Sequence, residues 1–250
     1  VVGRHLTTLA AQHMTPVLME LGGHAPVIVC EDTDVQAAAL TGAVRKMRNA
    51  GQVCTSPTRF FVHESIFEAY TETFVRRAAQ TVVGNGVEPG VEMGPLANER
   101  RVDALAGLVE DAVAQGAELK TGGSRLDGKG YFFEPTVLAN VPDSAHVMQE
   151  EPFGPLAIIN PVASLDEAIE QANSVPYGLA AYGFTNRADY VDQMVEYIEA
   201  GNVSINTLEA SLPETPFGGV KSSGYGREGG TEGLHNYMII KNISHSLSIT

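Results

Sequence analysis

One of the two cysteines, Cys54, stands in a polar turn rather than in an apolar run. The stretch "NAGQVCTSP" (49–57) follows a run of helical composition and precedes the strand-like "TRFFVH" (58–63). A free cysteine behaves as a small hydrophobe and is usually buried, so a thiol at such a junction needs another reason. The chemistry that suits the residue type is nucleophilic catalysis, in which a thiolate attacks an electrophilic carbon.

Carboxylates at two other places are candidates for acid–base chemistry. Glu20 ends the apolar stretch "PVLMEL" just before a pair of glycines, where it is either a general base for a thiol nucleophile or a solvated acid at a strand end. The adjacent Glu150 and Glu151 in "QEEPFGPL" are typical of an exposed loop, but Phe153 between proline and glycine indicates a turn that packs on something. "PFGG" recurs at 216–219 in a glycine-rich stretch that is either a flexible loop or a close backbone approach to a ligand.

Other chemistries are disfavoured. His24, the remaining histidines and Cys30 show no metal-ligand spacing, so we expect structural roles for them and no metal site. The sequence has no G-x-x-x-x-G-K-[ST] phosphate loop and no G-x-S-x-G elbow. "GNGVEPG" (84–90) indicates a turn cluster rather than a dinucleotide fingerprint.

The composition is that of a soluble globular protein. The 250 residues carry a net charge of −14, which disfavours binding to nucleic acid and to anionic membrane surfaces. So few cysteines fit a reducing compartment, although a disulfide between Cys30 and Cys54 stays open. No apolar run reaches transmembrane length, and "VVGRHLTTLAAQ" (1–12) lacks the pattern of a secretory signal, so we expect a cytoplasmic protein.

The elements that must position these residues alternate between strand-like and helix-like runs. Strands are expected over 15–21, 24–30, 58–63, 117–121, 131–138, 154–162, 178–185 and 201–206. Helices are expected over 4–13, 31–47, 64–80, 99–115, 164–173 and 187–200. This alternation predicts an α/β fold with a mostly parallel sheet flanked by helices. In such sheets sites lie at the carboxyl ends of strands, and Glu20, Cys54 and Asn206 all stand at or beside the ends of elements.

Six stretches together resemble the aldehyde dehydrogenase superfamily over nearly the whole chain. They are "LMELGGHAPVIV", "RNAGQVC", "EEPFGPL", "GLAAYGFT", "GNVSIN" and "PFGGVKSSGYGRE", in that order. The ELGG and GQxC motifs stand 34 residues apart, and the second glutamate of EEPFGP follows the cysteine by 97 residues. The resemblance implies an aldehyde dehydrogenase-like catalytic domain that uses NAD or NADP.

By this resemblance, Cys54 is the nucleophile that forms a thiohemiacetal and then a thioester with an aldehyde. Glu20 is the general base that activates the hydrolytic water, and Glu228 of the GRE motif is a candidate for proton release. The backbone amide of Cys54 would supply half of an oxyanion hole.

The cofactor contacts are carried over in the same way. The resemblance implies that Glu151 holds the nicotinamide ribose and that Phe153 lies against the nicotinamide ring. It also places Leu21 and Gly22 of the ELGG motif in the cofactor site.

Two further residues bear on the substrate. Arg48 resembles an arginine that succinate-semialdehyde dehydrogenases use for the substrate carboxylate, and Ser211 matches a serine of that subgroup. A guanidinium suits an ω-carboxyl aldehyde through bidentate pairing. Alternatively Arg48 only caps the preceding helix, and Glu209 in the second loop would repel an anionic tail.

Family members are about twice as long as this chain, so the resemblance implies a missing N-terminal half with most of the dinucleotide-binding sheet. We therefore expect a remnant of the NAD(P)-binding domain over 1–22, the catalytic domain over 23–222, and a C-terminal tail over 223–250 that contributes to a homodimer or homotetramer. Two rival hypotheses remain: a weakly esterolytic or inactive fragment, and a catalytically silent scaffold.

Overall fold

The computed structural model describes residues 1–248. Within them, seven strands form one sheet in the order β4-β5-β6-β3-β2-β7-β8, and every neighbouring pair is parallel except β4 with β5. The expected α/β fold class is confirmed. The strands are β2 (Ala25–Val29), β3 (Pro57–His63), β4 (Glu118–Thr121), β5 (Thr136–Ala139), β6 (Leu156–Val162), β7 (Ala180–Phe184) and β8 (Asn202–Ile205).

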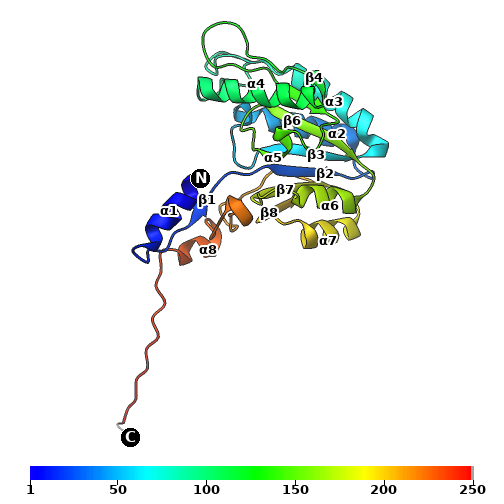
Figure 1. The fold of residues 1–250 in the computed structure, drawn as a ribbon. Coiled ribbons are helices and arrows are strands. Elements are labelled where there is room, and N and C mark those ends of the chain that lie inside the picture. The colour runs from blue at the N-terminus through cyan, green and yellow to red at the C-terminus, as the bar shows by residue number, and fades with distance from the viewer. Residues whose placement is uncertain (249–250) are drawn as a thin grey trace.

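Helices cover both faces of this sheet, as Figure 1 shows. One face carries α2 (Val35–Met47), α3 (Phe67–Ala79) and α4 (Glu99–Ala114), and the other carries α6 (Leu165–Asn173) and α7 (Ala188–Tyr197). The helices begin at side-chain caps where the sequence offers them. Asp34, Asn98 and Ser164 each accept a hydrogen bond from a backbone N–H of the first turn.

The central strands have apolar side chains on both faces because helices bury both. All five residues of β2 are buried, and so are the first six of β3. The crossover helices return the chain from the carboxyl end of one strand to the amino end of the next, so the amino ends of β2, β3, β6 and β7 meet at one edge. The candidate site lies at this edge of the sheet.

The strand expected over 131–138 is shorter and later than the sequence indicates. β5 spans only Thr136–Ala139, and before it Phe133 makes an isolated bridge to Arg125. A short helix, α5 (His146–Gln149), precedes β6 and was not expected.

The expected strand over 15–21 is mostly wrong. Only β1 (Met19–Glu20) is extended and paired, and its antiparallel partner is β9 (Gly224–Tyr225) near the other end of the chain. Helices α1 (Val2–Ala11) and α8 (Gly230–His235) flank this small ribbon, beyond which the chain runs away from the body as an extended segment (Figure 1).

Candidate active site

The residues singled out from the sequence gather at the amino edge of the sheet. Cys54 lies just before β3 begins at Pro57, and the ELGG glycines lie just before β2. Glu151 lies in the segment that enters β6. The expectation of a site at the carboxyl ends is therefore wrong for these residues, because each motif precedes its strand and parallel strands bring their amino ends together.

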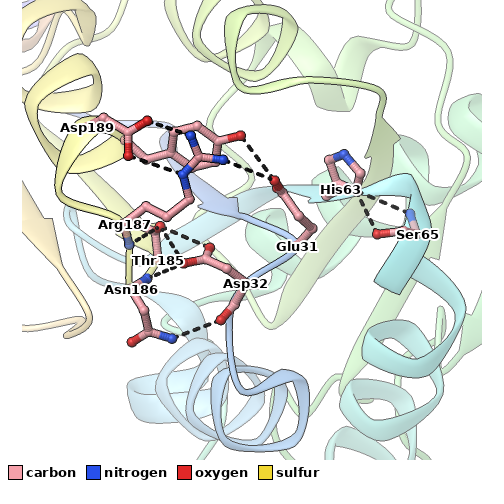
Figure 2. A network of polar contacts seen from close by, with 9 residues as sticks. Glu31, Asp32, His63, Ser65, Thr185, Asn186, Arg187 and Asp189 are labelled. Atoms are coloured by element: carbon pink, nitrogen blue, oxygen red, sulfur yellow. Dashed lines mark hydrogen bonds and ion pairs between the residues drawn. The ribbon is translucent and has the colours of Figure 1, made fainter.

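The carboxyl edge carries a polar network that is satisfied within itself. Figure 2 shows the carboxylate of Asp32 accepting hydrogen bonds from the Thr185 hydroxyl and the Asn186 backbone N–H. Asn206 belongs to the same edge, where its side chain bonds the N–H and carbonyl of Thr185. These contacts fasten the ends of β2, β7 and β8 to one another and give Asn206 a structural role.

The thiol turn is held in an unusual backbone conformation. Asn49, Ala50 and Gly51, in a short 3-10 segment η1 (Arg48–Gly51), have φ values of 53°, 52° and 68°. The Gln52 amide oxygen accepts a hydrogen bond from the backbone N–H of Ala97 at 2.8 Å. The Tyr182 hydroxyl donates to the carbonyl of Thr55 at 2.7 Å, so both flanks of Cys54 are anchored.

Glycines allow the three motifs to touch. A Cβ added at Gly23 would lie 2.5 Å from the carbonyl oxygen of Cys54, and one at Gly22 would collide with the Glu151 carboxylate. Gly51, beside the thiol, lies against the carbonyl of Gly154 in the same manner. The ELGG, GQxC and EEPFGP motifs therefore form one packed unit.

The electrostatics of this unit favour a neutral thiol. Cys54 is half-buried, and burial is the largest cause of its raised pKa. The negative charges of Glu151 and Glu20 raise this pKa further. Hydrogen bonding to the backbone N–H groups of Cys54 and Thr55 acts in the opposite direction. Because two carboxylates act on one sulfur, the nucleophile and both candidate acids share one electrostatic environment.

Glu20 is a half-buried carboxylate with a second acid nearby. Burial raises the pKa of its carboxyl, and the charge of Glu228 raises it further. Hydrogen bonding to the backbone of Gly219 and the charge of Arg227 lower this pKa. Its Oε1 is buried and has no hydrogen-bond partner among the described residues. Glu228 is exposed, and backbone pairing between it and Phe217 holds it near Glu20.

Glu151 is held against the ELGG glycines. Its Oε1 accepts a hydrogen bond from the backbone N–H of Gly23 at 3.2 Å. Burial raises the pKa of this carboxyl to about 7, and the charges of Lys46 and Arg101 oppose the shift.

Sequence reasoning missed Lys46, a basic residue in the last turn of α2. The side chain is fully buried, and its Nζ donates to Ser56 Oγ at 3.2 Å and Thr58 Oγ1 at 3.3 Å. Burial lowers the pKa of Lys46 to about 7, and the charge of Glu151 acts against that shift. The hydroxyl pair two and four residues after Cys54 was the available signal, because a buried ammonium needs such acceptors.

A cleft of about 900 Å³ lies beside the amino end of α1. Leu21, Gly22 and Glu151 line it together with Gly3, whereas Phe153 is not among the residues of its wall. Phe153 has φ 45°, a conformation rare for an aromatic residue. The cleft has glycine backbone in its wall and a carboxylate able to accept from hydroxyl groups, so its residues fit a dinucleotide.

Of the two candidate substrate residues, only Arg48 lines a pocket. Arg48 is the C-cap residue of α2 and also lines a second pocket, of about 660 Å³, so capping and ligand binding are compatible. Ser211 is exposed and is not among the residues that line that pocket.

Within residues 1–248, no group of three or more His, Cys, Asp or Glu side chains is arranged to hold a metal ion. In the same part of the chain, no helix has the length and apolarity needed to cross a bilayer.

The sheet, its amino-edge site and the three packed motifs define an aldehyde dehydrogenase fold. The chain belongs to the aldehyde dehydrogenase family, whose model matches residues 1–243. It is 47% identical over 240 residues to 4-(hydroxymethyl)benzenesulfonate dehydrogenase TsaD1 of Comamonas testosteroni, covering 96% of this chain and 50% of that protein. It is 42% identical over 236 residues to a succinate-semialdehyde dehydrogenase of Paenarthrobacter nicotinovorans, covering 94% of this chain and 52% of that protein.

A solved structure agrees with the fold. The crystal structure of an E. coli NADP dependent enzyme superposes with a TM-score of 0.94 at 38% identity, covering 96% of this chain and 50% of that one. The chain spans about half the length of the curated relatives it matches.

Proposed function

We propose that this protein oxidises an aldehyde to the carboxylic acid, with NAD or NADP as electron acceptor, through a covalent intermediate on Cys54. The observation that carries the proposal is the convergence of one thiol and two carboxylates at the amino edge of the sheet, with both carboxylates acting on the sulfur. Family membership supports the same chemistry.

In the proposed reaction, the thiolate form of Cys54 attacks the aldehyde carbon and a C–S bond forms. The carbonyl oxygen becomes an alkoxide, to which the backbone N–H of Cys54 is a candidate donor. After the carbon is oxidised, a thioester to Cys54 remains. Glu20 removes a proton from water, the hydroxide adds to the thioester, and the C–S bond breaks to release the acid and the thiolate.

The bound dinucleotide would supply the acceptor for the hydride that leaves the substrate carbon. Glu151 would hold hydroxyl groups of its ribose, while Leu21 and Gly22 form part of the wall of the cleft. Phe153 and Glu228 keep the roles that the resemblance implies, against the ring and in proton release. The proposal covers both NAD and NADP.

For the substrate we propose an aldehyde with an acidic group at its far end, such as succinate semialdehyde. Arg48 supports this, since it offers a guanidinium in a pocket next to the thiol turn. The relatives' names point the same way, one specifying succinate semialdehyde and the other a benzenesulfonate. Ser211, exposed in the loop that follows Glu209, keeps the role that the resemblance implies.

Hydrolysis of activated esters is a second candidate activity of the chain itself. Cys54 and Glu20 both lie within it, and acyl transfer to a thiol followed by base-assisted hydrolysis needs no dinucleotide. The third hypothesis, a silent scaffold, predicts no turnover at all.

One experiment separates these hypotheses. The 250-residue chain is assayed for p-nitrophenyl acetate hydrolysis and for aldehyde-dependent reduction of NAD and NADP. We expect Cys54→Ala to abolish both activities, and Glu20→Gln to give a burst of nitrophenolate with slow turnover. Hydrolysis that survives Cys54→Ala would refute the assigned nucleophile.

We further propose a homodimer or homotetramer. The extended segment after α8 exposes Tyr237, Met238, Ile239 and Ile240 with at least 66% of each residue's surface accessible, and such apolar patches favour association. Light scattering of the chain and of a version ending at residue 236 tests this. We expect the shorter chain to form assemblies of fewer subunits. Assemblies with the same number of subunits would contradict the proposal.

A further inference from the structure

The pocket that Arg48 lines is rich in charge. It lies between α2, the end of α3 and the segment 206–209, and has a volume of about 660 Å³. Leu40, Val44 and Leu208 provide apolar wall. Three arginines, Arg45, Arg48 and Arg77, and two glutamates, Glu92 and Glu209, provide its charges.

Both glutamates are already paired. Arg77 binds Glu92 through a short ion pair, and Arg45 Nη2 lies 2.9 Å from Glu209 Oε2. Within residues 1–248, Arg48 has no carboxylate within ion-pair distance. The pocket therefore presents one uncompensated guanidinium, which is that of Arg48.

Glu209 is held beside the pocket by its backbone as well as by Arg45. Its carbonyl accepts a hydrogen bond from Ser204 Oγ at 2.9 Å, and its N–H donates to Thr207 Oγ1 at 3.3 Å. Removing the arginine would leave this carboxylate in place and without its cation.

A buried phenol connects the Arg45–Glu209 pair to the thiol. Tyr182 donates to the carbonyl of Thr55, the residue after Cys54. Burial raises the pKa of Tyr182 to about 12. The charge of Arg45 lowers this pKa, whereas the charges of Cys54 and Glu209 raise it. The Arg45–Glu209 ion pair and Cys54 therefore both lie near the Tyr182 side chain.

We infer that Arg45 is a specificity-determining residue, which neutralises Glu209 so that Arg48 can attract the anionic end of an aldehyde toward Cys54. This inference rests on the proposed function. Without Arg45, the Glu209 carboxylate would repel the anion and oppose Arg48, while neutral reagents would be unaffected.

The test compares two alkylating reagents of similar size in the 250-residue chain. Iodoacetate is anionic and iodoacetamide is neutral, and both consume the thiolate, so the ratio of their rates at Cys54 cancels changes in thiol pKa. Peptide mass spectrometry distinguishes Cys54 from the buried Cys30.

We expect Arg45→Gln to lower the iodoacetate-to-iodoacetamide ratio roughly three- to tenfold, with a smaller effect at high salt. Glu209→Gln should not lower the ratio, and the double variant Arg45→Gln/Glu209→Gln should restore it. Arg76→Gln is the matched control, because Arg76 pairs with Glu72 on the exposed side of α3 and does not line the pocket. An unchanged ratio in Arg45→Gln, or no restoration in the double variant, would overturn the inference.

A second measurement does not need a reactive thiol. In a Cys54→Ala background, the affinity for succinate, with neutral succinamide as control, is expected to fall in Arg45→Gln and to recover when Glu209→Gln is added. Succinate affinity that is indifferent to Arg45 would reject the inference. If Cys54 resists both alkylating reagents while succinate binding follows the expected pattern, the assigned nucleophile fails and the role of Arg45 stands.

Discussion

Gly23 lies against the carbonyl oxygen of Cys54, so closely that any Cβ there would sit 2.5 Å from it. The same residue donates its backbone N–H to the Glu151 carboxylate at 3.2 Å. One glycine thus contacts both the proposed nucleophile and the acid proposed to hold the cofactor, and the packing of this site depends on its lack of a side chain.

Gly23→Ala is expected to move the Cys54 carbonyl. Because the neighbouring atom is backbone and the position is buried, the strain should destabilise the fold by about 1–3 kcal/mol. The rate of Cys54 alkylation should change as well. Urea unfolding and iodoacetamide labelling measure the two effects.

The matched control is Gly107→Ala in α4, an exposed helical glycine with open space around it. That substitution should stabilise the chain by about 0.5–1 kcal/mol and leave labelling unchanged. Equal effects of the two substitutions would argue against the packed unit.

The pH dependence of Cys54 alkylation should have its midpoint above the ordinary range of a thiol. Burial and the charges of Glu151 and Glu20 disfavour the thiolate, so Glu151→Gln and Glu20→Gln should each lower the midpoint, Glu151→Gln by more. Glu150→Gln, which removes the adjacent exposed charge, should leave it unchanged. A midpoint that does not move in Glu151→Gln would contradict the shared environment.

Lys46 should make stability depend on pH. The folded chain releases the Lys46 proton at a pKa of about 7, whereas the unfolded chain keeps it up to the ordinary lysine value. Between these values the unfolded state binds more protons, so this lysine's contribution to the free energy of unfolding becomes more favourable as pH rises.

We therefore expect the stability of Lys46→Met relative to the unmodified chain to fall by about 2–3 kcal/mol from about pH 6 to about pH 9. Lys129→Met, at an exposed lysine, should show no such trend. Urea unfolding at several pH values provides the measurement, and parallel curves for the two variants would show that Lys46 titrates normally.

Arg59 is a buried cation without an anionic partner in ion-pair range among the described residues. It donates to the carbonyls of His24, Gln171 and Ala172 at 2.9–3.1 Å, and so ties the start of β2 to the end of α6. Arg59→Met should lower stability by at least about 3 kcal/mol, since three carbonyls lose a charged donor.

The lysine variant tests the role of the forked guanidinium. Arg59→Lys should recover only part of the loss, because an ammonium cannot reproduce that geometry. Arg187→Met, on the surface, should cost much less than Arg59→Met. Calorimetric or urea unfolding that finds Arg59→Met as mild as Arg187→Met would contradict this role.

Much of the fold could be predicted from local pattern. The apolar run 24–30 is β2, and the alternation of strands with helices predicted the parallel sheet. The edge that carries the site could also have been predicted, because the thiol turn, the ELGG glycines and EEPFGP each stand before a strand rather than after one.

Other features depend on residues that are far apart in the sequence. Nothing near Glu20 indicates that it pairs with Gly224, since that contact exists only after the whole sheet has formed. The burial of Lys46 likewise follows from the hydroxyls of Ser56 and Thr58, which the chain brings back beneath α2 after the thiol turn. Nothing near Arg45 in the sequence indicates that it pairs with Glu209, which lies 164 residues further along the chain.

The ribbon of β1 and β9 also sets an order of assembly. It joins segments from nearly opposite ends of the described chain, so its formation must wait for a long loop to close, whereas β2 and β3 are joined by one helix. In pulse-labelling during refolding, the amide of Leu21, which bonds the carbonyl of Ser223, should gain protection after that of Val27. On this order, a newly synthesised chain acquires its thiol turn first and the carboxylate of Glu20 last, so the proposed covalent chemistry would wait for the final stage of folding.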